Sequence, residues 1–392
     1  MFTEAAGDHV TGADGRRYLD LNAQNGGATL GHRHPRVVEA LAGIVRSGSP
    51  FLVPLGVPSA TGPLAARLCA LAGGELARVY FCTGGSEAID NAMKFAMAAT
   101  GRQGFVAFGQ AFHGFTSGPL PLVGHDYWRL PVQHYAPEGR YRVPFGDLEA
   151  LAKVLAGGEV AAVLVEPVQG LGGARAWEPA ALREVARLCA EHGTLLIADE
   201  VLTGIGRTGR WFAFQHAGIE PDLVVCSKGL SGGMVPVAAV LMTEAVHRAV
   251  YAGPHRAYIH NSTFEGHLLG MVAGLTVLDA IEQEGVLERA VRTGELLRSR
   301  LAELAGEGIG VREVRGLGML LAVRIEGLSA PESPDGAAAM VDLMLRRGVL
   351  LEAAAHAQNW LRLTPPLTLA EESVEVFATA LRESAAELAL RR

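Results

Sequence analysis

Short apolar segments alternate with stretches of helical periodicity over residues 58–284. Strands as apolar as these segments are buried on both faces, and strands separated by helices usually run parallel. We therefore expect an α/β protein whose mainly parallel sheet is covered by helices on both sides. The predicted strands are residues 78–82, 104–108, 161–165, 195–198, 223–226 and 236–241.

A different pattern begins at Gly285, after a long helix predicted over roughly residues 266–284. Helices and strands follow without the parallel-sheet pattern, which indicates a smaller α+β domain. Its predicted elements are a helix to about residue 305, strands near 311–315 and 319–325, and helices over 336–347 and 370–390.

The N-terminal residues predict a strand over 18–21 and a helix after Pro35, and we assign both to the smaller domain. The chain then divides into a large domain, residues 46–285, and a small domain built from residues 1–45 and 286–392.

Composition argues against several classes of protein. The 392 residues have a formal net charge of −7 and no basic stripe, which argues against a nucleic-acid partner. No window reaches the roughly 18 uninterrupted apolar residues of a membrane span. The first residues lack the basic start and apolar run of a signal peptide. The four cysteines show neither metal-ligand nor disulfide spacing, so we expect a cytoplasmic protein. Since the sequence has no apolar run of membrane-spanning length, we expect no membrane partner.

Lysine is rare in this chain. Only three of the 34 basic residues are lysines, namely Lys94, Lys153 and Lys228. Lys94 and Lys153 fall in helical patterns, where a long charged side chain belongs on a solvated face. Lys228 instead follows the predicted strand 223–226 and precedes a glycine-rich loop, so it is the lysine at a strand end.

Two acids follow the neighbouring predicted strand. Residues 195–198 lead into Asp199 and Glu200. The carboxyl ends of parallel strands meet at one edge of a sheet, where ligands bind. A lysine and a carboxylate at that edge suit an enzyme that uses pyridoxal phosphate. The lysine forms a Schiff base, and the carboxylate keeps the pyridine nitrogen protonated.

A Gly-Gly turn joins a predicted strand to a predicted helix at Gly84, Gly85 and Ser86. Glycines let the backbone approach an anion, and the first N–H groups of a helix can hold a phosphate. Ser86 adds a hydroxyl donor. Taken alone, the segment is better explained as a helix start with a serine cap.

Two further segments place polar or aromatic side chains where a ligand can lie. Phe112 and His113 precede a glycine, and an aromatic ring there can stack on a flat cofactor, although a core phenylalanine is the simpler interpretation. Glu166 ends the buried segment 161–165, so its carboxylate is either a ligand-facing acid or a structural cap.

Together these segments resemble the class III aminotransferases, pyridoxal-phosphate enzymes of fold type I. The most specific part is Asp199-Glu200-Val201 followed at family spacing by Ser227-Lys228-Gly229. The resemblance runs through most of the chain, over residues 15–21, 30–35, 85–88, 112–114, 166–170, 197–201, 203–204, 206–209, 221–222, 227–229, 262–264 and 361–367.

The resemblance implies roles for the residues that match. Lys228 carries the pyridoxal 5′-phosphate covalently and moves the proton, and Asp199, rather than Glu200, pairs with the pyridine nitrogen. Phe112 and Val201 sandwich the ring, and Glu166 lies near the ring and the lysine.

The resemblance also implies the remaining contacts. Gly85 and Ser86 bind the phosphate, and His113 belongs to the same cofactor site. Thr263 reaches the phosphate of the neighbouring subunit, which implies a homodimer. Arg362 binds a substrate carboxylate, a task that its planar fork of donors suits.

Two positions depart from the ornithine and 4-aminobutyrate branch of that family. Those enzymes usually carry a glutamate that covers the carboxylate-binding arginine, and this chain has Leu171 there. They usually carry a glutamine near the phenolic oxygen of the cofactor, and this chain has Leu202. Both changes make the site more apolar and favour an ω-amino acid or amine transaminase, whereas Arg362 matches the ornithine branch.

The resulting hypothesis is a ping-pong aminotransferase that moves an amino group from an amino acid or amine to an aldehyde, ketone or keto acid. A racemase or epimerase, an aminomutase and a phospho-lyase of the same family remain alternatives, because they share the lysine and the acid. A non-catalytic nucleotide-binding protein is a more remote alternative, in which Lys228 is an ordinary loop lysine.

Overall fold

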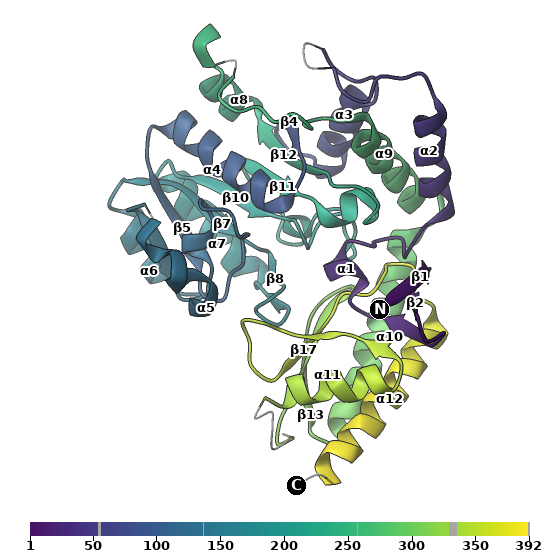
Figure 1. Cartoon of the computed structure of the whole chain (residues 1–392). Helices are drawn as coiled ribbons and strands as arrows, with labels where there is room; N and C mark the ends of the chain where they lie inside the picture. Colours follow the sequence, from purple (N-terminus) through teal and green to yellow (C-terminus); the bar gives the residue numbers. More distant parts are fainter. Residues whose placement is uncertain (54–55, 136, 257, 329–334, 391–392) are drawn as a thin grey trace.

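The computed structural model describes residues 1–53, 56–135, 137–256, 258–328 and 335–390, and its largest element is a seven-stranded sheet (Figure 1). Strand β12 runs antiparallel to both of its neighbours, and the other pairs of adjacent strands are parallel. The predicted mainly parallel sheet is therefore confirmed. In spatial order the strands are β4 (Leu76–Cys82), β12 (Ala238–Thr243), β11 (Leu223–Cys226), β10 (Leu195–Asp199), β7 (Val160–Val165), β5 (Gly104–Phe108) and β6 (Arg140–Val143).

The central strands are buried on both faces because their apolar side chains alternate between two helical layers. In β11, Val224 and Cys226 belong to one core cluster, and Leu223 and Val225 belong to the other. One layer contains α4 (Gly85–Thr100) and α8 (Glu244–Val250). The other contains α3 (Thr61–Ala72), α6 (Leu148–Leu155), α7 (Pro179–Glu191) and α9 (Leu268–Gln283).

Two smaller four-stranded sheets follow, and one of them combines strands from both ends of the chain. In Figure 1 the purple N-terminal strands lie beside the yellow-green C-terminal helices. One sheet contains β1 (Phe2–Ala6), β2 (His9–Gly12), β3 (Arg17–Asp20) and β15 (Val349–Leu350), with β3 and β15 parallel. The other is antiparallel and contains β13 (Val311–Leu317), β14 (Leu320–Ile325), β17 (Trp360–Leu363) and β16 (Glu352–Ala353).

Long helices cover these sheets and join them to the larger part. Gly285, in the left-handed region with a φ of 59°, caps the start of α10, as only a residue tolerant of positive φ does easily. The predicted helix after Pro35 is present but packs against α9. That helix is α2 (Pro35–Arg46), and the helices on the smaller sheets are α10 (Val286–Gly306), α11 (Gly336–Arg346) and α12 (Glu371–Leu390).

The remaining elements are short. Within the described ranges, no helix combines the length and apolarity needed to cross a bilayer. The short elements are α1 (Ala23–Gly26), α5 (Asp126–Arg129), β8 (Val168–Gln169), β9 (Arg175–Ala176), η1 (Leu120–Leu122), η2 (Leu130–Tyr135), η3 (Ala213–His216), η4 (Lys228–Ser231) and η5 (Pro254–Arg256).

Candidate active site

A cavity of about 460 Å³ opens where β10 and β11 end. Asp199 is the last residue of β10, and Lys228 follows β11 by two positions. Because the two strands are parallel neighbours, both side chains line this cavity. Nine of the ten residues predicted for the site line it, namely Gly85, Ser86, Phe112, His113, Glu166, Asp199, Val201, Lys228 and Arg362.

A buried acid and a histidine form the floor of the cavity. Oδ2 of Asp199 lies 2.7 Å from Nδ1 of His113, and the main-chain N–H of Val201 donates to Oδ1 of Asp199 over 3.1 Å. Burial lowers the pKa of His113, but the hydrogen bond and charge of Asp199 outweigh it and raise that pKa above its ordinary value. The histidine is therefore a donor that holds the Asp199 carboxylate in place.

Glu166 ties two loops of the cavity together. The main-chain N–H of Phe112 donates to its Oε1 over 2.8 Å, and that of Gly170 donates to its Oε2 over 3.3 Å. Burial, reinforced by Asp199 and opposed by His113, raises the pKa of the Glu166 carboxyl. Glu166 therefore caps loop N–H groups and also lines the cavity, and its contact with a ligand stays a prediction.

Lys228 is half-buried at the start of η4, with a φ of 33° that side-chain-bearing residues adopt only under strain. Burial and the nearby Arg362 lower the pKa of its amine to about 8, against the opposing charges of Asp199 and Glu166. An amine with that pKa is partly neutral near pH 8 and can act as a nucleophile or a base.

The other two lysines lie outside the cavity. Lys153 is exposed on α6, as expected. Lys94 is half-buried on α4, and its Nζ lies 2.7 Å from Nδ1 of His260. The prediction of a solvated face for Lys94 is therefore wrong, because a histidine from a distant segment covers it.

The N-terminus of α4 is open toward the cavity. Gly84 is its N-cap and makes no side-chain capping bond, and Ser86 Oγ accepts from the N–H of Phe115 over 3.2 Å. The serine therefore does not cap the helix, which removes the simpler explanation of this segment. A Cβ on Gly85 would lie 2.8 Å from Cγ1 of Val201, so the backbone approaches Val201 too closely for a side chain.

Aromatic side chains form one wall of the cavity. The ring of Phe112 meets those of Phe115 and Trp128 edge to face, with centroids 4.9 Å and 5.6 Å away. His356 lies behind them, 5.0 Å from Trp128. Such a wall offers an apolar surface to a flat ring or a hydrocarbon chain.

Arg362 lies in β17 and is 2% exposed. Its Nη2 contacts Oε1 of Glu352 and donates to Oδ1 of Asn25 over 2.9 Å. Burial lowers the pKa of the guanidinium to about 10, so it stays cationic at neutral pH. Leu171 and Leu202, where the sequence departs from the ornithine branch, also line the cavity.

Thr263 is the predicted residue that does not line the cavity. It lies exposed in a turn, next to Phe264, whose side chain is 57% exposed. Its predicted contact, with a neighbouring subunit, concerns a second chain and stays a prediction.

Sequence reasoning missed Asn25, Trp128 and Glu352 as residues of the cavity. Asn25 lies in a turn where Ala23, Gln24 and Asn25 all have positive φ, and left-handed backbone on a run of such residues leaves no simple sequence signal. Glu352 belongs to a two-residue strand. Only the pairing of that strand with β17 brings it to Arg362.

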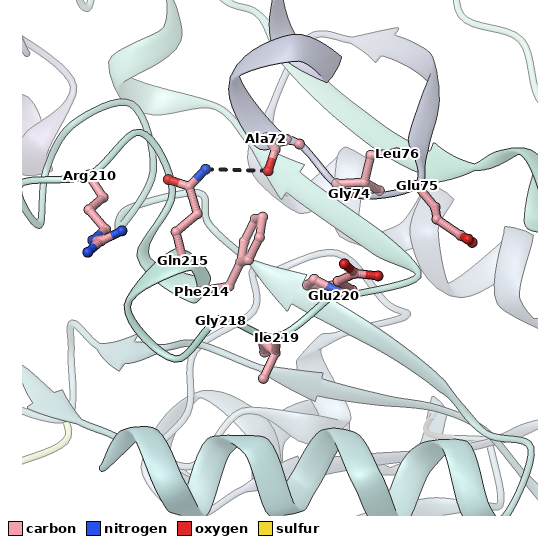
Figure 2. Close-up of a pocket in the computed structure, with 12 residues that line it drawn as sticks. Ala72, Gly74, Glu75, Leu76, Arg210, Phe214, Gln215, Gly218, Ile219 and Glu220 are labelled. Atoms are coloured by element: carbon pink, nitrogen blue, oxygen red, sulfur yellow. Dashed lines mark hydrogen bonds between the residues drawn. The ribbon is translucent and has the colours of Figure 1, made fainter.

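A second cavity, of about 360 Å³, lies away from this site (Figure 2). Its rim carries Glu75, Arg210 and Glu220, and the amide of Gln215 donates to the carbonyl of Ala72 over 3.3 Å. None of the ten predicted site residues lines it. The candidate chemistry therefore belongs to the cavity at the ends of β10 and β11.

The residues of the first cavity fit pyridoxal phosphate. The uncapped start of α4 and the close approach at Gly85 suit an anion. A buried carboxylate, a half-buried amine and an aromatic wall match the nitrogen, the aldehyde and the ring of that cofactor. The volume lies within the usual range for cofactor sites.

Comparison with known proteins identifies the family. The model of the class III aminotransferase family matches residues 1–384. The chain is 36% identical to diaminobutyrate–2-oxoglutarate aminotransferase of Rhizobium meliloti (strain 1021), covering 96% of this chain and 86% of that protein. It is 31% identical to aminotransferase PigE of Serratia sp. (strain ATCC 39006), covering 99% of this chain but only half of that protein's length.

Solved structures agree. An ornithine aminotransferase of Toxoplasma gondii superimposes with a TM-score of 0.90 at 28% identity, covering 100% of this chain and 91% of that one. An amine transaminase of an uncultivated Pseudomonas species, in a form with pyridoxal phosphate (PLP) bound, superimposes with a TM-score of 0.90 at 27% identity. The match covers 99% of this chain and 95% of that one. The chain therefore belongs to the class III aminotransferases of fold type I, enzymes that use pyridoxal phosphate to transfer amino groups between amine donors and carbonyl acceptors.

Proposed function

We propose that the cavity at the ends of β10 and β11 transfers an amino group from an ω-amino acid or amine to a keto acid, ketone or aldehyde by a ping-pong cycle. The observation that carries this proposal is that Lys228 and Asp199, which are 29 positions apart, line one cavity. When bound, pyridoxal phosphate supplies an electron-accepting ring beside the reacting carbon.

In this proposal Lys228 holds the cofactor and afterwards moves a proton at its Nζ. The lowered pKa, about 8, supports that role because the amine can gain and lose a proton near neutral pH. Asp199 faces the cofactor nitrogen and keeps it protonated. The support for Asp199 is that His113 and the N–H of Val201 hold its carboxylate in one orientation.

The remaining residues bind the cofactor and orient it. Gly85 and Ser86 hold the phosphate through the open N-terminus of α4. Phe112 and Val201 enclose the ring from two sides of the cavity. Glu166 fixes the loop that carries Phe112, since it accepts from the N–H of that residue.

Arg362 binds the carboxylate of an acidic substrate. A guanidinium that is 2% exposed is desolvated, and its hydrogen bonds to a carboxylate are therefore strong. Leu171 and Leu202 leave the surroundings apolar, which suits the carbon chain of an ω-amino acid or an alkylamine. The relatives named for diaminobutyrate, 2-oxoglutarate, ornithine and amine substrates include both charged and uncharged ends.

The protein we propose is a cytoplasmic homodimer in which Thr263 of one subunit completes the phosphate site of the other. The exposed position of Thr263 and Phe264, outside their own cavity, supports a contact made across an interface. The free thiols of Cys69, Cys82 and Cys189 support a reducing compartment.

The test is a half-reaction followed by absorbance. Amino donor alone, added to enzyme loaded with pyridoxal phosphate, removes the visible band of the cofactor, and a keto acid then restores it. We expect Lys228→Ala to lower the rate of the donor-driven absorbance change by at least about three orders of magnitude. Lys153→Ala, which changes an exposed lysine on α6, should behave as wild type.

Other results would contradict the proposal. A racemase would leave the band unchanged after donor alone, although it exchanges the α-proton. Protein that never acquires a cofactor band, with or without Lys228, would point to the non-catalytic alternative.

A further inference from the structure

Glu352 and Arg362 are direct partners across two antiparallel strands. The register of β16 and β17 places Glu352 opposite Arg362. Directly opposed residues on one face have their side chains within reach of each other. Oε1 of Glu352 contacts Nη2 of Arg362, and both residues line the cavity. The guanidinium proposed to bind substrate carboxylates is therefore already occupied by a carboxylate of the protein.

The two partners differ in their access to water. The side chain of Glu352 is 33% exposed, whereas that of Arg362 is 2% exposed. A glutamate at the solvent boundary can turn away and remain hydrated, but a buried guanidinium cannot. The strand that carries Glu352 is two residues long and lies at the edge of its sheet. Glu352 is therefore the partner that can move.

Arg362 has few other partners that could compensate its charge. Its other side-chain partner is the neutral amide oxygen of Asn25, and its Nε is buried without a hydrogen-bond partner within the described residues. Arg207 is buried nearby, and its side chain donates to main-chain carbonyls. When Glu352 leaves, a second carboxylate has to replace it.

The position where related enzymes carry a covering glutamate is Leu171 in this chain, and its side chain lines the same cavity. A leucine can neither neutralise nor release a guanidinium. The one carboxylate that contacts Arg362 in the described structure comes from β16 instead.

We propose that Glu352 is an exchangeable counter-ion on Arg362, so that the one site accepts substrates with either a carboxylate or an uncharged distal end. A distal carboxylate displaces Glu352 toward solvent and takes its place. A substrate with an uncharged end leaves the pair intact, and the chain of that substrate lies against Leu171 and Leu202. This inference rests on the proposed function, because it assigns Arg362 to substrate recognition.

The test compares two amines that differ only at the distal end, 5-aminopentanoate and pentylamine. In Glu352→Gln no anion competes for Arg362. We therefore expect the second-order rate constant of the half-reaction with 5-aminopentanoate to rise about fivefold. The same change leaves Arg362 uncompensated beside a hydrocarbon chain, so the value for pentylamine should fall about fivefold. The expected signature is this crossed effect.

Binding of pentanoate, which cannot react, gives a second measurement. By calorimetry on the cofactor-loaded enzyme, Glu352→Gln should bind pentanoate about fivefold more tightly, and Arg362→Ala should lose at least about tenfold in affinity. Glu326→Gln is the matched control. Glu326 pairs with Arg312 and Arg324 outside the cavity, and its loss should change neither measurement.

Three results would overturn the inference. Equal changes for both amines, or no change in either, would show that the pair is structural. A selective loss of activity toward a diamine would show that Glu352 binds a distal ammonium instead. If wild-type enzyme reacted with no amine, the proposed function would fail, but pentanoate binding would still decide the role of Glu352.

Discussion

At the scale of single residues, the site depends on charges whose ordinary solvation has been removed. Asp199 is 4% exposed, and its carboxylate has two donors, Nδ1 of His113 and the N–H of Val201. A buried carboxylate is held in one orientation only while its donors remain. His113 therefore positions the acid that we propose for the cofactor nitrogen.

We predict that His113→Phe weakens the binding of pyridoxal phosphate about tenfold or more, the usual effect of losing a hydrogen-bonded supporting residue. The reason is that Asp199 keeps only one of its two donors. His113→Asn retains an N–H donor and should recover most of the affinity. Absorbance titration of cofactor-free protein measures this constant. Equal affinity in His113→Phe and wild type would contradict the positioning role.

At the scale of elements, one close contact joins two segments that flank the cofactor. Gly85 starts α4, Val201 follows β10, and a Cβ on Gly85 would overlap Val201. The neighbouring Gly84 has an extended φ of −154°, and a Cβ on it would meet no other atom within 4 Å. Gly84 therefore offers a matched comparison.

Gly85→Ala should lower the stability of the loaded enzyme by about 1–3 kcal/mol, as overpacking usually does, and weaken cofactor binding. Gly84→Ala should change both far less. The double variant Gly85→Ala/Val201→Ala removes the overlapping methyl groups and should recover stability. Thermal unfolding at a fixed cofactor concentration measures the stability of the three variants. A Gly84 variant that loses as much stability as the Gly85 variant would refute the prediction.

The strands show how much of the fold can be predicted from local sequence. Runs of apolar residues bounded by turns predicted 104–108 and 223–226 with the bounds of β5 and β11, and predicted the strand before Asp199 to within one residue. These strands are buried on both faces, so local composition is enough to detect them.

The elements that were missed depend on distant partners. β16 is two residues long and owes its place to β17. The left-handed turn at Asn25 is held by Arg362 and by Thr364, whose hydroxyl donates to the carbonyl of Asn22. The motifs therefore predicted most of the residues that line the cavity, Arg362 included, whereas Asn25 and Glu352 reach it through long-range pairing that no local pattern encodes.

At the scale of the whole molecule, buried acids make stability depend on pH. Glu200 is fully buried, and burial raises the pKa of its carboxyl to about 7. It accepts from the hydroxyl of Thr203 and, over 2.7 Å, from the N–H of Phe214. Because its pKa is raised on folding, its contribution is fully present below about pH 4.5 and is lost as the pH rises to about 7.

Glu200→Gln removes this titration while an amide oxygen still accepts from Phe214. We expect the variant to gain stability relative to wild type between pH 5 and pH 8, on the order of 3 kcal/mol in total. Urea unfolding of the loaded enzyme at several pH values measures the difference. Glu149→Gln, at an exposed position on α6, should show no such trend. If the stability difference between Glu200→Gln and wild type were the same at every pH, the titration of Glu200 would be disproved.

The cavity joins parts of the chain that are made at very different times during synthesis. The cavity-lining groups proposed for the cofactor come from residues 85–228, whereas Asn25 lies more than 300 residues before Glu352 and Arg362. Contacts of such high sequence separation form late in folding, because a long loop must first close. The part of the substrate end that surrounds Arg362 can therefore change through residues 22–29 and 352–364 while the residues of the cofactor end stay the same. Diversification of substrates within one unchanged chemistry follows from where the pieces of this cavity lie in the gene.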